Sequence, residues 1–304
     1  MKNSFMKLSL GDTIGLVATA SKFDVKAFEQ AKRKLIDLGF KIKHTKSIYL
    51  NDEGFAGNPK KRANDLNKMF ADPKVKAVFC IRGGFGSQHI IPFLNTKLIK
   101  ENPKIFLGFS DITVLHLYLE KACNLACFHG PSIIAAFQNQ KLEKQYIKDI
   151  NDLFIKTDTP YSITFPKGKY KDKKIIKAKV TGGNLSLLIT SIGTVYEFNA
   201  KNKILFIEDV NEKMYKIDRM LSHLYYAKKF NGIKALIFGQ MCKKSRELKY
   251  KKNIEKCLKR LWQNNKIPFP IIYSFPSGHY DSNRIIPLER TCEINIKEGL
   301  AKFI

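Results

Sequence analysis

The stretch "IFLGFSDITVLH" places a serine where an apolar strand gives way to a new apolar pattern. Gly108 stands two residues before Ser110 and permits a tight strand-to-helix turn. Such a nucleophile elbow exposes the serine Oγ and aims the following N–H, that of Asp111, at a developing oxyanion. Serine is also a common helix N-cap, because its hydroxyl accepts a hydrogen bond from the first helical turn. Taken alone, the stretch favours the cap over the nucleophile.

A glycine-rich turn, "IRGGFGS" over residues 81–87, ends another expected strand. Its glycines permit positive φ and allow backbone N–H groups to approach a ligand, while Arg82 adds a positive charge. The turn lacks the lysine of a phosphate-binding loop and the full spacing of a dinucleotide fingerprint. An ordinary tight turn explains the pattern equally well.

A base for the serine is offered by His279, in the loop "PSGHYDSN" that follows an apolar strand. A base of this kind needs a carboxylate to orient it, and "LFIEDV" supplies Glu208 and Asp209 at the end of a strand. The alternatives are a solvated loop histidine and two solvated acids. Among the other histidines, His116 lies on an apolar helix, and His129 begins a turn that is either structural or near the site.

Short β-rich runs alternate with amphipathic stretches through the first half of the chain. Strands are expected at residues 13–20, 75–84 and 105–109, and helices at 24–40, 87–94 and 111–121. This rhythm predicts an α/β fold with a doubly wound, mostly parallel sheet, in which ligands bind beyond the carboxyl ends of the strands. A lysine-rich segment without sustained period then predicts a linker over residues 155–174. We therefore expect an N-terminal domain over 1–154 and a smaller, mixed, strand-rich C-terminal α/β domain over 175–304.

The 304 residues carry a formal charge of +27, spread along the chain rather than gathered on one element. A nucleic-acid binder more often clusters its lysines or interleaves them with aromatic residues, so we expect no nucleic-acid partner. No apolar run approaches the ~20 residues of a membrane span, and no signal peptide is evident. The six sparse cysteines fit reduced thiols in a cytoplasmic protein, and no cysteine or histidine pairs complete a metal site.

Seven motifs occur in an order that resembles the LD-carboxypeptidases of serine peptidase family S66, which includes muropeptide LD-carboxypeptidases and microcin C self-immunity peptidases. The resemblance extends from about residue 11 to residue 288. The motifs are "GDTIGLVATAS", "IRGGFGS", "LGFSDIT", "HGP", "TGGNLSLL", "FIEDVNEKMYKIDRML" and "PSGHYDSNRIIPL".

The resemblance implies a Ser-His-Glu triad with Ser110 as nucleophile, His279 as general base and Glu208 as the orienting acid. It also implies an oxyanion hole made by the backbone N–H groups of Asp111 and Gly84. It implies no cofactor and suggests a homodimer. A carboxypeptidase must bind the terminal carboxylate of its substrate, and for that role our own candidates are the two residues before Gly84, namely Arg82 and Gly83.

By the same resemblance, the expected reaction is cytoplasmic removal of the terminal D-alanine from murein tetrapeptide during cell-wall recycling. An immunity-type peptidase that cleaves a peptide–nucleotide antibiotic is the alternative within the family. An aromatic residue placed to stack on a nucleobase would favour it, but the single tryptophan, Trp262, lies on an expected helix. A non-catalytic basic protein that binds wall fragments is the alternative of another class.

Overall fold

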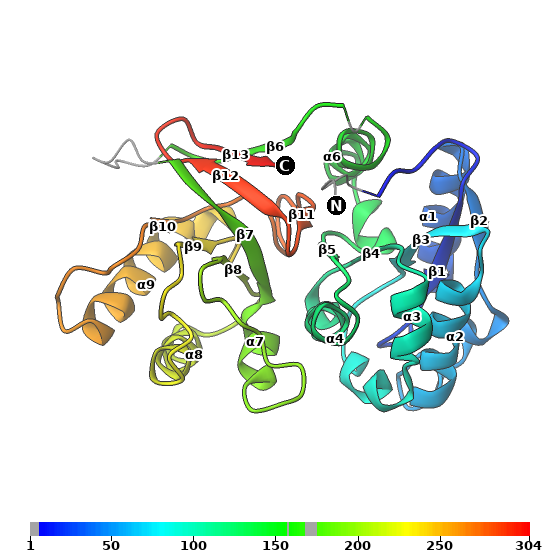
Figure 1. Cartoon of the computed structure of the whole chain (residues 1–304), viewed down its shortest axis with the longest axis horizontal. Coiled ribbons are helices and arrows are strands. Elements are labelled where there is room, and N and C mark those ends of the chain that lie inside the picture. Colours follow the sequence, from blue (N-terminus) through cyan, green and yellow to red (C-terminus); the bar gives the residue numbers. More distant parts are fainter. Residues whose placement is uncertain (1–5, 157, 168–174) are drawn as a thin grey trace. The chain divides into compact units, whose positions relative to one another are not determined.

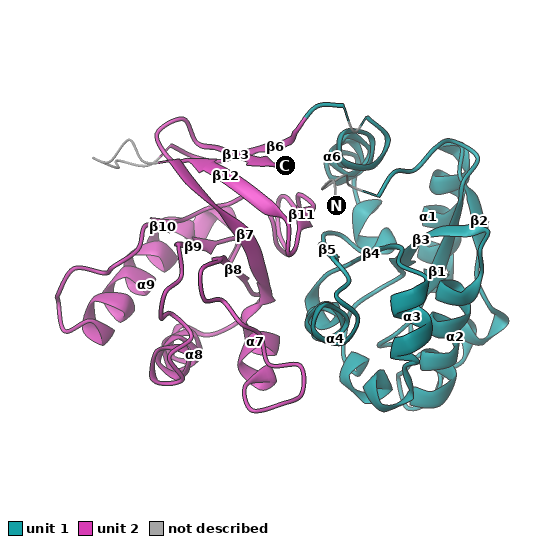
Figure 2. Ribbon diagram, in the orientation of Figure 1, with its two compact units in different colours: residues 1–159 teal, residues 160–304 magenta. Residues whose placement is uncertain are grey.

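The computed structural model describes residues 6–156, 158–167 and 175–304, and the chain divides into two compact units (Figure 2). Unit 1 is Met1–Thr159 and unit 2 is Pro160–Ile304. The predicted linker over residues 155–174 was wrong in one part, because residues 161–164 form a strand of unit 2. Its side chains alternate between buried and more exposed, but four residues are too few to stand out among lysines and prolines. Residues 168–174 of the predicted linker lie outside the described residues.

Unit 1 contains a parallel sheet with the strand order β5-β4-β3-β1-β2, which confirms the prediction of a mostly parallel N-terminal sheet (Figure 1). In this order the chain reverses its direction of winding between β1 and β3, and such a switch point is where open α/β sheets bind ligands. The strands are β1 (Thr13–Val17), β2 (Lys41–Lys43), β3 (Val75–Cys80), β4 (Ile105–Gly108) and β5 (Phe128–His129).

Most α-helices of unit 1 begin at a residue whose side chain caps the first turn. Asp24 caps the first helix by accepting a hydrogen bond from Ala27 N at 2.7 Å, and Gly39 follows its end at φ +93°. The α-helices are α1 (Val25–Asp37), α2 (Pro59–Ala71), α3 (Thr96–Glu101), α4 (Thr113–Cys123), α5 (Ile133–Ala136) and α6 (Gln140–Ile150). Shorter 3-10 and π segments are η1 (Lys46–Tyr49), η2 (Ser87–Phe93), η3 (Ser110–Ile112) and η4 (Asn151–Ile155).

Two of the expected helices differ in type or start. The helix expected at residues 87–94 is the 3-10 segment η2, because Pro92 within it cannot donate a backbone hydrogen bond. The helix expected at 111–121 begins as the 3-10 turn η3 and becomes α-helical only at Thr113. The chain therefore continues as a 3-10 segment after both β3 and β4, the two strands nearest the predicted nucleophile.

Unit 2 contains a mixed sheet with the strand order β10-β9-β8-β7-β12-β13-β6. The first four strands in this order are parallel, and the remaining neighbours pair antiparallel, which confirms the mixed, strand-rich C-terminal unit. The strands of the unit are β6 (Tyr161–Thr164), β7 (Ile175–Asn184), β8 (Ile204–Glu208), β9 (Ala235–Phe238), β10 (Ile271–Ile272), β11 (Ile286–Pro287), β12 (Thr291–Asn295) and β13 (Leu300–Phe303).

Helices connect the parallel strands of unit 2 (Figure 1). They are α7 (Leu185–Ser191), α8 (Met214–Tyr226), the 3-10 turn η5 (Lys244–Arg246) and α9 (Glu247–Leu261). All five residues of β8 and all four of β9 are buried, as expected for central strands of a parallel sheet. In the described part of the chain, no helix has both the length and the apolar character needed to cross a membrane.

Candidate active site

Ser110 lies directly after Phe109, at the carboxyl end of β4, and has φ +62°. This left-handed conformation is uncommon for a residue with a side chain and costs of order 1–3 kcal/mol, so it persists only where the surrounding structure enforces it. No side-chain capping hydrogen bond is found at the start of η3 or of α4, among the residues that the structure describes. The strained turn is the geometry of a nucleophile elbow rather than of an N-cap.

The glycine turn, residues 81–87, lies next to this serine. A Cβ placed on Gly83 would come within 3.1 Å of Ser110 Cβ and 3.5 Å of its Oγ, so the Gly83 backbone lies against the hydroxyl. Gly84 has φ +106°, and a Cβ there would meet Ser21 Oγ at 2.4 Å. Ser21 also stabilises this glycine turn, because its Oγ accepts a hydrogen bond from Phe85 N at 3.0 Å. A side chain at Gly84 would therefore displace Ser21, and one at Gly83 would need Ser110 or the carbonyl of Phe109 to shift by a few tenths of an ångström.

Asp111 uses its side chain to bind the glycine turn. Its Oδ2 accepts a hydrogen bond from Ser87 N at 2.7 Å, and the residue is 2% exposed. Burial raises the pKa of the Asp111 carboxyl, and the hydrogen bonds from Ser87 and the charge of Arg62 oppose that shift. Sequence reasoning assigned a role only to the Asp111 amide and missed the carboxylate.

Arg82 is exposed at the start of the glycine turn. Its Nη1 donates a hydrogen bond to the carbonyl oxygen of Lys22 at 3.0 Å. This contact joins the segment after β3 to the segment after β1. Carboxylate binding by Arg82 stays a prediction.

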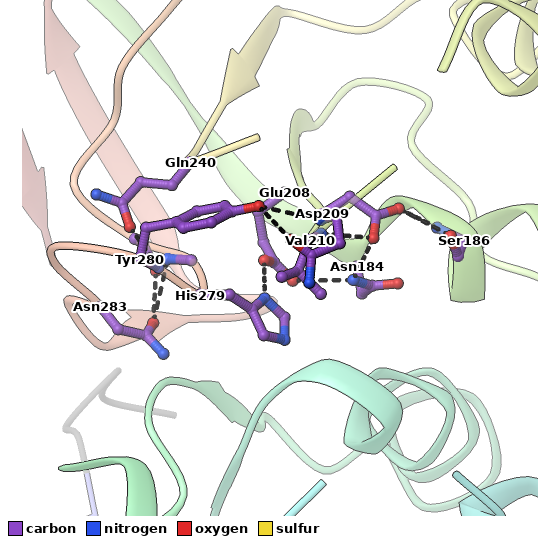
Figure 3. Close-up of polar contacts among 12 residues, drawn as sticks. Asn184, Ser186, Glu208, Asp209, Val210, Gln240, His279, Tyr280 and Asn283 are labelled. Carbon is purple, nitrogen blue, oxygen red and sulfur yellow. Dashed lines mark hydrogen bonds and ion pairs between the residues drawn. The ribbon is translucent and has the colours of Figure 1, made fainter. Parts of the chain in front are cut away.

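In unit 2, His279 and Glu208 are joined by a hydrogen bond (Figure 3). Nδ1 of His279 lies 2.6 Å from Oε2 of Glu208, whose side chain is fully buried, while the histidine side chain is 14% exposed. A carboxylate can only accept, so Nδ1 carries the proton and the lone pair of the neutral ring lies on Nε2. The structure thus brings together the two residues expected to act as base and orienting acid.

Opposing effects set the proton affinity of this histidine. Burial lowers the pKa of His279, but the charge of Glu208, the hydrogen bond to it and the charge of Asp209 together outweigh burial. The net result is a pKa raised above the usual 6.5. Carboxylates in this position stabilise the imidazolium that forms during proton transfer.

Asp209, the other acid considered for this role, has hydrogen-bond partners other than His279 (Figure 3). Its Oδ2 accepts from Ser186 N at 3.0 Å and from Ser186 Oγ at 2.8 Å. Asn184 links the two acids, because its Nδ2 lies 3.1 Å from Asp209 Oδ1 and 3.3 Å from Glu208 Oε1. Burial, followed by the charge of Glu208, raises the pKa of Asp209. Asn184 was not predicted as a site residue.

The loop that carries His279 is held by polar side chains on both sides (Figure 3). Gln240 Oε1 accepts a hydrogen bond from Tyr280 N at 3.0 Å, and Asn283 Oδ1 accepts one from Gly278 N at 3.3 Å. Gly278 has φ +145°, and a Cβ there would lie 2.9 Å from Gln240 Cβ. The loop therefore passes too close to Gln240 to tolerate a side chain before the histidine.

Residues of this network follow the carboxyl ends of the parallel strands of unit 2. Asn184 ends β7, Glu208 ends β8, Gln240 follows β9 and His279 follows β10. Parallel strands end at the same edge of a sheet, so this topology gathers residues that are up to 95 positions apart in the chain.

The two remaining histidine candidates are buried in unit 1. His116 on α4 is 1% exposed and His129 at β5 is fully buried, with ring centroids 6.2 Å apart. Burial, followed by the charge of His129, lowers the pKa of His116 well below 6.5. These rings belong to the core beneath Phe109 and Phe106. Within the described residues, no group of three or more histidine, cysteine and acidic side chains could hold a metal ion.

Two family models match this chain. The LD-carboxypeptidase N-terminal domain matches residues 14–130, and the LD-carboxypeptidase C-terminal domain matches residues 177–294. A curated relative, a probable murein peptide carboxypeptidase of Bacillus subtilis, is 32% identical over 97% of this chain and 92% of its own. The chain belongs to the LD-carboxypeptidase family.

Other relatives in the LD-carboxypeptidase family carry two different descriptions. A murein tetrapeptide carboxypeptidase of Pseudomonas aeruginosa is 28% identical over 91% of each chain. The microcin C7 self-immunity protein MccF of Escherichia coli is 28% identical over 77% of this chain and 76% of its own. A structure of wild-type MccF has a TM-score of 0.87 and 24% identity, and covers 99% of this chain and 98% of that one. That structural likeness supports the α/β fold of both units.

Proposed function

We propose that this LD-carboxypeptidase family member is a serine carboxypeptidase that releases the terminal D-alanine of murein tetrapeptide, as a step of cell-wall recycling. The observation that carries the proposal is the 2.6 Å pair of His279 Nδ1 and Glu208 Oε2. The strained turn at Ser110, with φ +62°, supports it from the other unit. The murein descriptions of two relatives supply the substrate class.

In the proposed mechanism, Nε2 of His279 takes the proton of Ser110, and Oγ attacks the carbonyl carbon before the D-alanine nitrogen. The N–H groups of Asp111 and Gly84 bind the oxyanion of the tetrahedral intermediate. His279 then gives its proton to the leaving nitrogen as the C–N bond breaks. A water molecule, deprotonated by the same histidine, attacks the ester and releases the tripeptide. Glu208 keeps the proton on Nδ1 and stabilises the imidazolium.

The test is incubation with L-Ala-γ-D-Glu-meso-diaminopimelate-D-Ala, followed by mass spectrometry. We expect loss of one alanine with the wild-type protein and none with Ser110→Ala, provided that the variant keeps the wild-type circular dichroism spectrum. Turnover that survives Ser110→Ala removes this serine from the nucleophile role. An intact tetrapeptide after incubation with the wild-type protein rejects the substrate.

A second candidate is cleavage of a peptide–nucleotide antibiotic, which the similarity to MccF over 77% of this chain favours. The same Ser110 chemistry would act on a different acyl donor. Parallel incubation with an aminoacyl sulfamoyl nucleoside separates the two candidates, because each predicts faster turnover of its own substrate. The homodimer, the cytoplasmic location and carboxylate binding by Arg82 and Gly83 stay predictions.

A further inference from the structure

A buried arginine of unit 1 binds three backbone carbonyl oxygens near the glycine turn. Arg62 lies on α2 and is 1% exposed. Its Nε donates to Gly57 O at 2.9 Å, and its Nη1 donates to Thr19 O at 2.5 Å and to Gly86 O at 3.0 Å. Its guanidinium also lies over the ring of Phe55, 5.1 Å from the ring centroid. A buried guanidinium with these contacts fixes the loops that it joins.

The loops joined by Arg62 flank the point where the sheet reverses its winding. Thr19 follows β1 and Gly86 follows β3, and these neighbouring strands are the two at which the chain changes direction. Ligands of open α/β sheets bind in the crevice at this point. Arg62 binds a carbonyl oxygen on each side of the crevice and so fixes the separation of its two walls. The glycine turn is part of one of these walls.

The same turn is held from the other side by the residue after the nucleophile. Asp111 Oδ2 accepts from Ser87 N, one residue beyond the carbonyl that Arg62 binds. The charge of Arg62 lowers the pKa of the Asp111 carboxyl, against the larger effect of burial, so the two side chains attract each other. Arg62 and Asp111 therefore bind one and the same peptide group, that between Gly86 and Ser87, the first at its carbonyl oxygen and the second at its N–H.

We propose that Arg62 is a positioning residue, which holds the glycine turn so that Gly84 N–H faces the oxyanion formed at Ser110. The proposal rests on the proposed function and adds a residue that does not touch the substrate. A lysine cannot replace this arginine, because one ammonium group cannot reach three carbonyl oxygens with the planar geometry of a guanidinium. A displaced turn weakens oxyanion binding in the transition state and leaves ground-state binding largely unchanged.

The experiment compares Arg62→Met and Arg62→Lys with Lys104→Met. Lys104 is a matched control, since it is also a buried cation of unit 1, 6% exposed, whose Nζ donates to Val75 O at 2.7 Å. It lies at the amino ends of β3 and β4, the edge of the sheet opposite Ser110. Any buried cation lost from this unit lowers the melting temperature, but only Arg62 should lower kcat.

For Arg62→Met we expect a loss in kcat of about 100-fold, the scale of one lost oxyanion-hole donor, with KM within about threefold of wild type. Arg62→Lys should recover part of the melting temperature but little of kcat. Lys104→Met should keep kcat within about threefold. A folded Arg62 variant with wild-type kcat overturns the proposal, and so does an equal loss of kcat in Lys104→Met. If Arg62→Met does not fold, the Arg62→Lys result decides.

A second readout keeps the proposal separate from the choice of substrate. Phosphonylation of Ser110 by a fluorophosphonate probe also develops negative charge on an oxygen next to the serine, and it needs no muropeptide. The Arg62 variants should react about 100-fold more slowly and Lys104→Met at the wild-type rate. If the tetrapeptide is not cleaved but this pattern holds, the murein function is rejected and the role of Arg62 stands. If the tetrapeptide is cleaved and the Arg62→Met variant is labelled at the wild-type rate, the murein function stands and the role of Arg62 is rejected.

Discussion

Nδ1 of His279 lies 2.6 Å from Oε2 of Glu208, a carboxylate that β8 holds completely out of solvent. The histidine is itself partly exposed, so one end of the pair is accessible while the other is buried. This arrangement keeps the ring in one tautomer and raises the pKa of His279, the proposed base. The pH dependence of the enzyme follows from it directly.

Activity should fall on the acid side with a midpoint above pH 6.5. The base works only when neutral, and the pKa of His279 is raised, so protonation begins at a higher pH than for a free imidazole. The profile of kcat/KM for the tetrapeptide measures this midpoint. Asp209→Asn removes one of the charges that raise it and should move the midpoint to lower pH. A midpoint at or below 6.5 in the wild-type protein would contradict the prediction.

Glu208→Gln should lower kcat by about 10³- to 10⁴-fold while KM changes little. The amide keeps the size of the side chain but no longer selects the tautomer with the proton on Nδ1, nor stabilises the imidazolium. Steady-state kinetics of the purified variant measure the loss. Glu293→Gln is the control, because that acid pairs with Lys177 on the surface of β12. A loss below tenfold in Glu208→Gln would argue for another orienting group.

Ser110→Gly should be more stable than Ser110→Ala by about 1 kcal/mol, although neither turns over substrate. Glycine adopts φ +62° without strain, whereas alanine retains the strain that serine carries. Urea denaturation of the two variants measures the difference. At Ser222, inside α8, the same pair should show the opposite order, since glycine weakens a helix interior. Equal stability of the two Ser110 variants would mean that the turn is not strained.

Gly83→Ala should lower kcat for the tetrapeptide by at least tenfold in a protein that still folds. The added methyl group would lie 3.1 Å from Ser110 Cβ and 3.3 Å from the carbonyl oxygen of Phe109, so it displaces either the turn or the nucleophile. Circular dichroism and steady-state kinetics check the two parts of the prediction. Gly193→Ala is the control for kcat, because a Cβ there meets nothing within 4 Å, although the φ of +81° at this position strains an alanine. Wild-type kcat in Gly83→Ala would show that the turn can move away without consequence.

The free energy of unfolding should decrease as the pH falls below 6.5. The pKa of His116 is depressed by burial in the folded state, so the unfolded chain binds the proton first and gains stability relative to the folded chain. His116→Leu should flatten this dependence at pH 5–6, because neither ring nitrogen has a hydrogen-bond partner among the described residues. Denaturation at several pH values measures the effect. The same replacement at the exposed His223 is the control. A His116→Leu variant whose free energy of unfolding depends on pH as in the wild type would contradict the prediction.

Local signals in the sequence were sufficient for most of unit 1. The apolar run at residues 105–109 predicts β4, and the pair of Asp24 and Gly39 marks both ends of α1. The 3-10 turns after β3 and β4 were missed, because i→i+3 and i→i+4 hydrogen bonding have nearly the same apolar period over one turn. The strand β6 was missed because it is short and depends on pairing with β13, a contact that no local pattern reveals.

The candidate site was predictable where residue type alone limits the chemistry, as for a serine, a histidine and an acid at strand ends. The supporting residues were harder, because their roles depend on contacts between distant segments. Arg62 sits in a polar stretch rich in lysine, yet it shares the buried stripe of Leu66 and Met69, four and seven positions later. That spacing was the available signal. For Asn184 the signal was its place before an apolar helical run, which predicts only a cap.

The ten residues of β7 pair with two partners in succession. Lys179 and the residues before it pair antiparallel with β12, and the stretch from Val180 to Asn184 pairs parallel with β8. Deleting one residue inside β7 would therefore turn either the antiparallel part of the sheet or Asn184 to the opposite face. Unit 2 should thus tolerate changes of length in its surface loops, such as the turn at Asn231 and Gly232, but not in this strand. The number of residues in β7 therefore determines where Asn184 lies, and with it whether Asn184 Nδ2 can reach both Glu208 and Asp209.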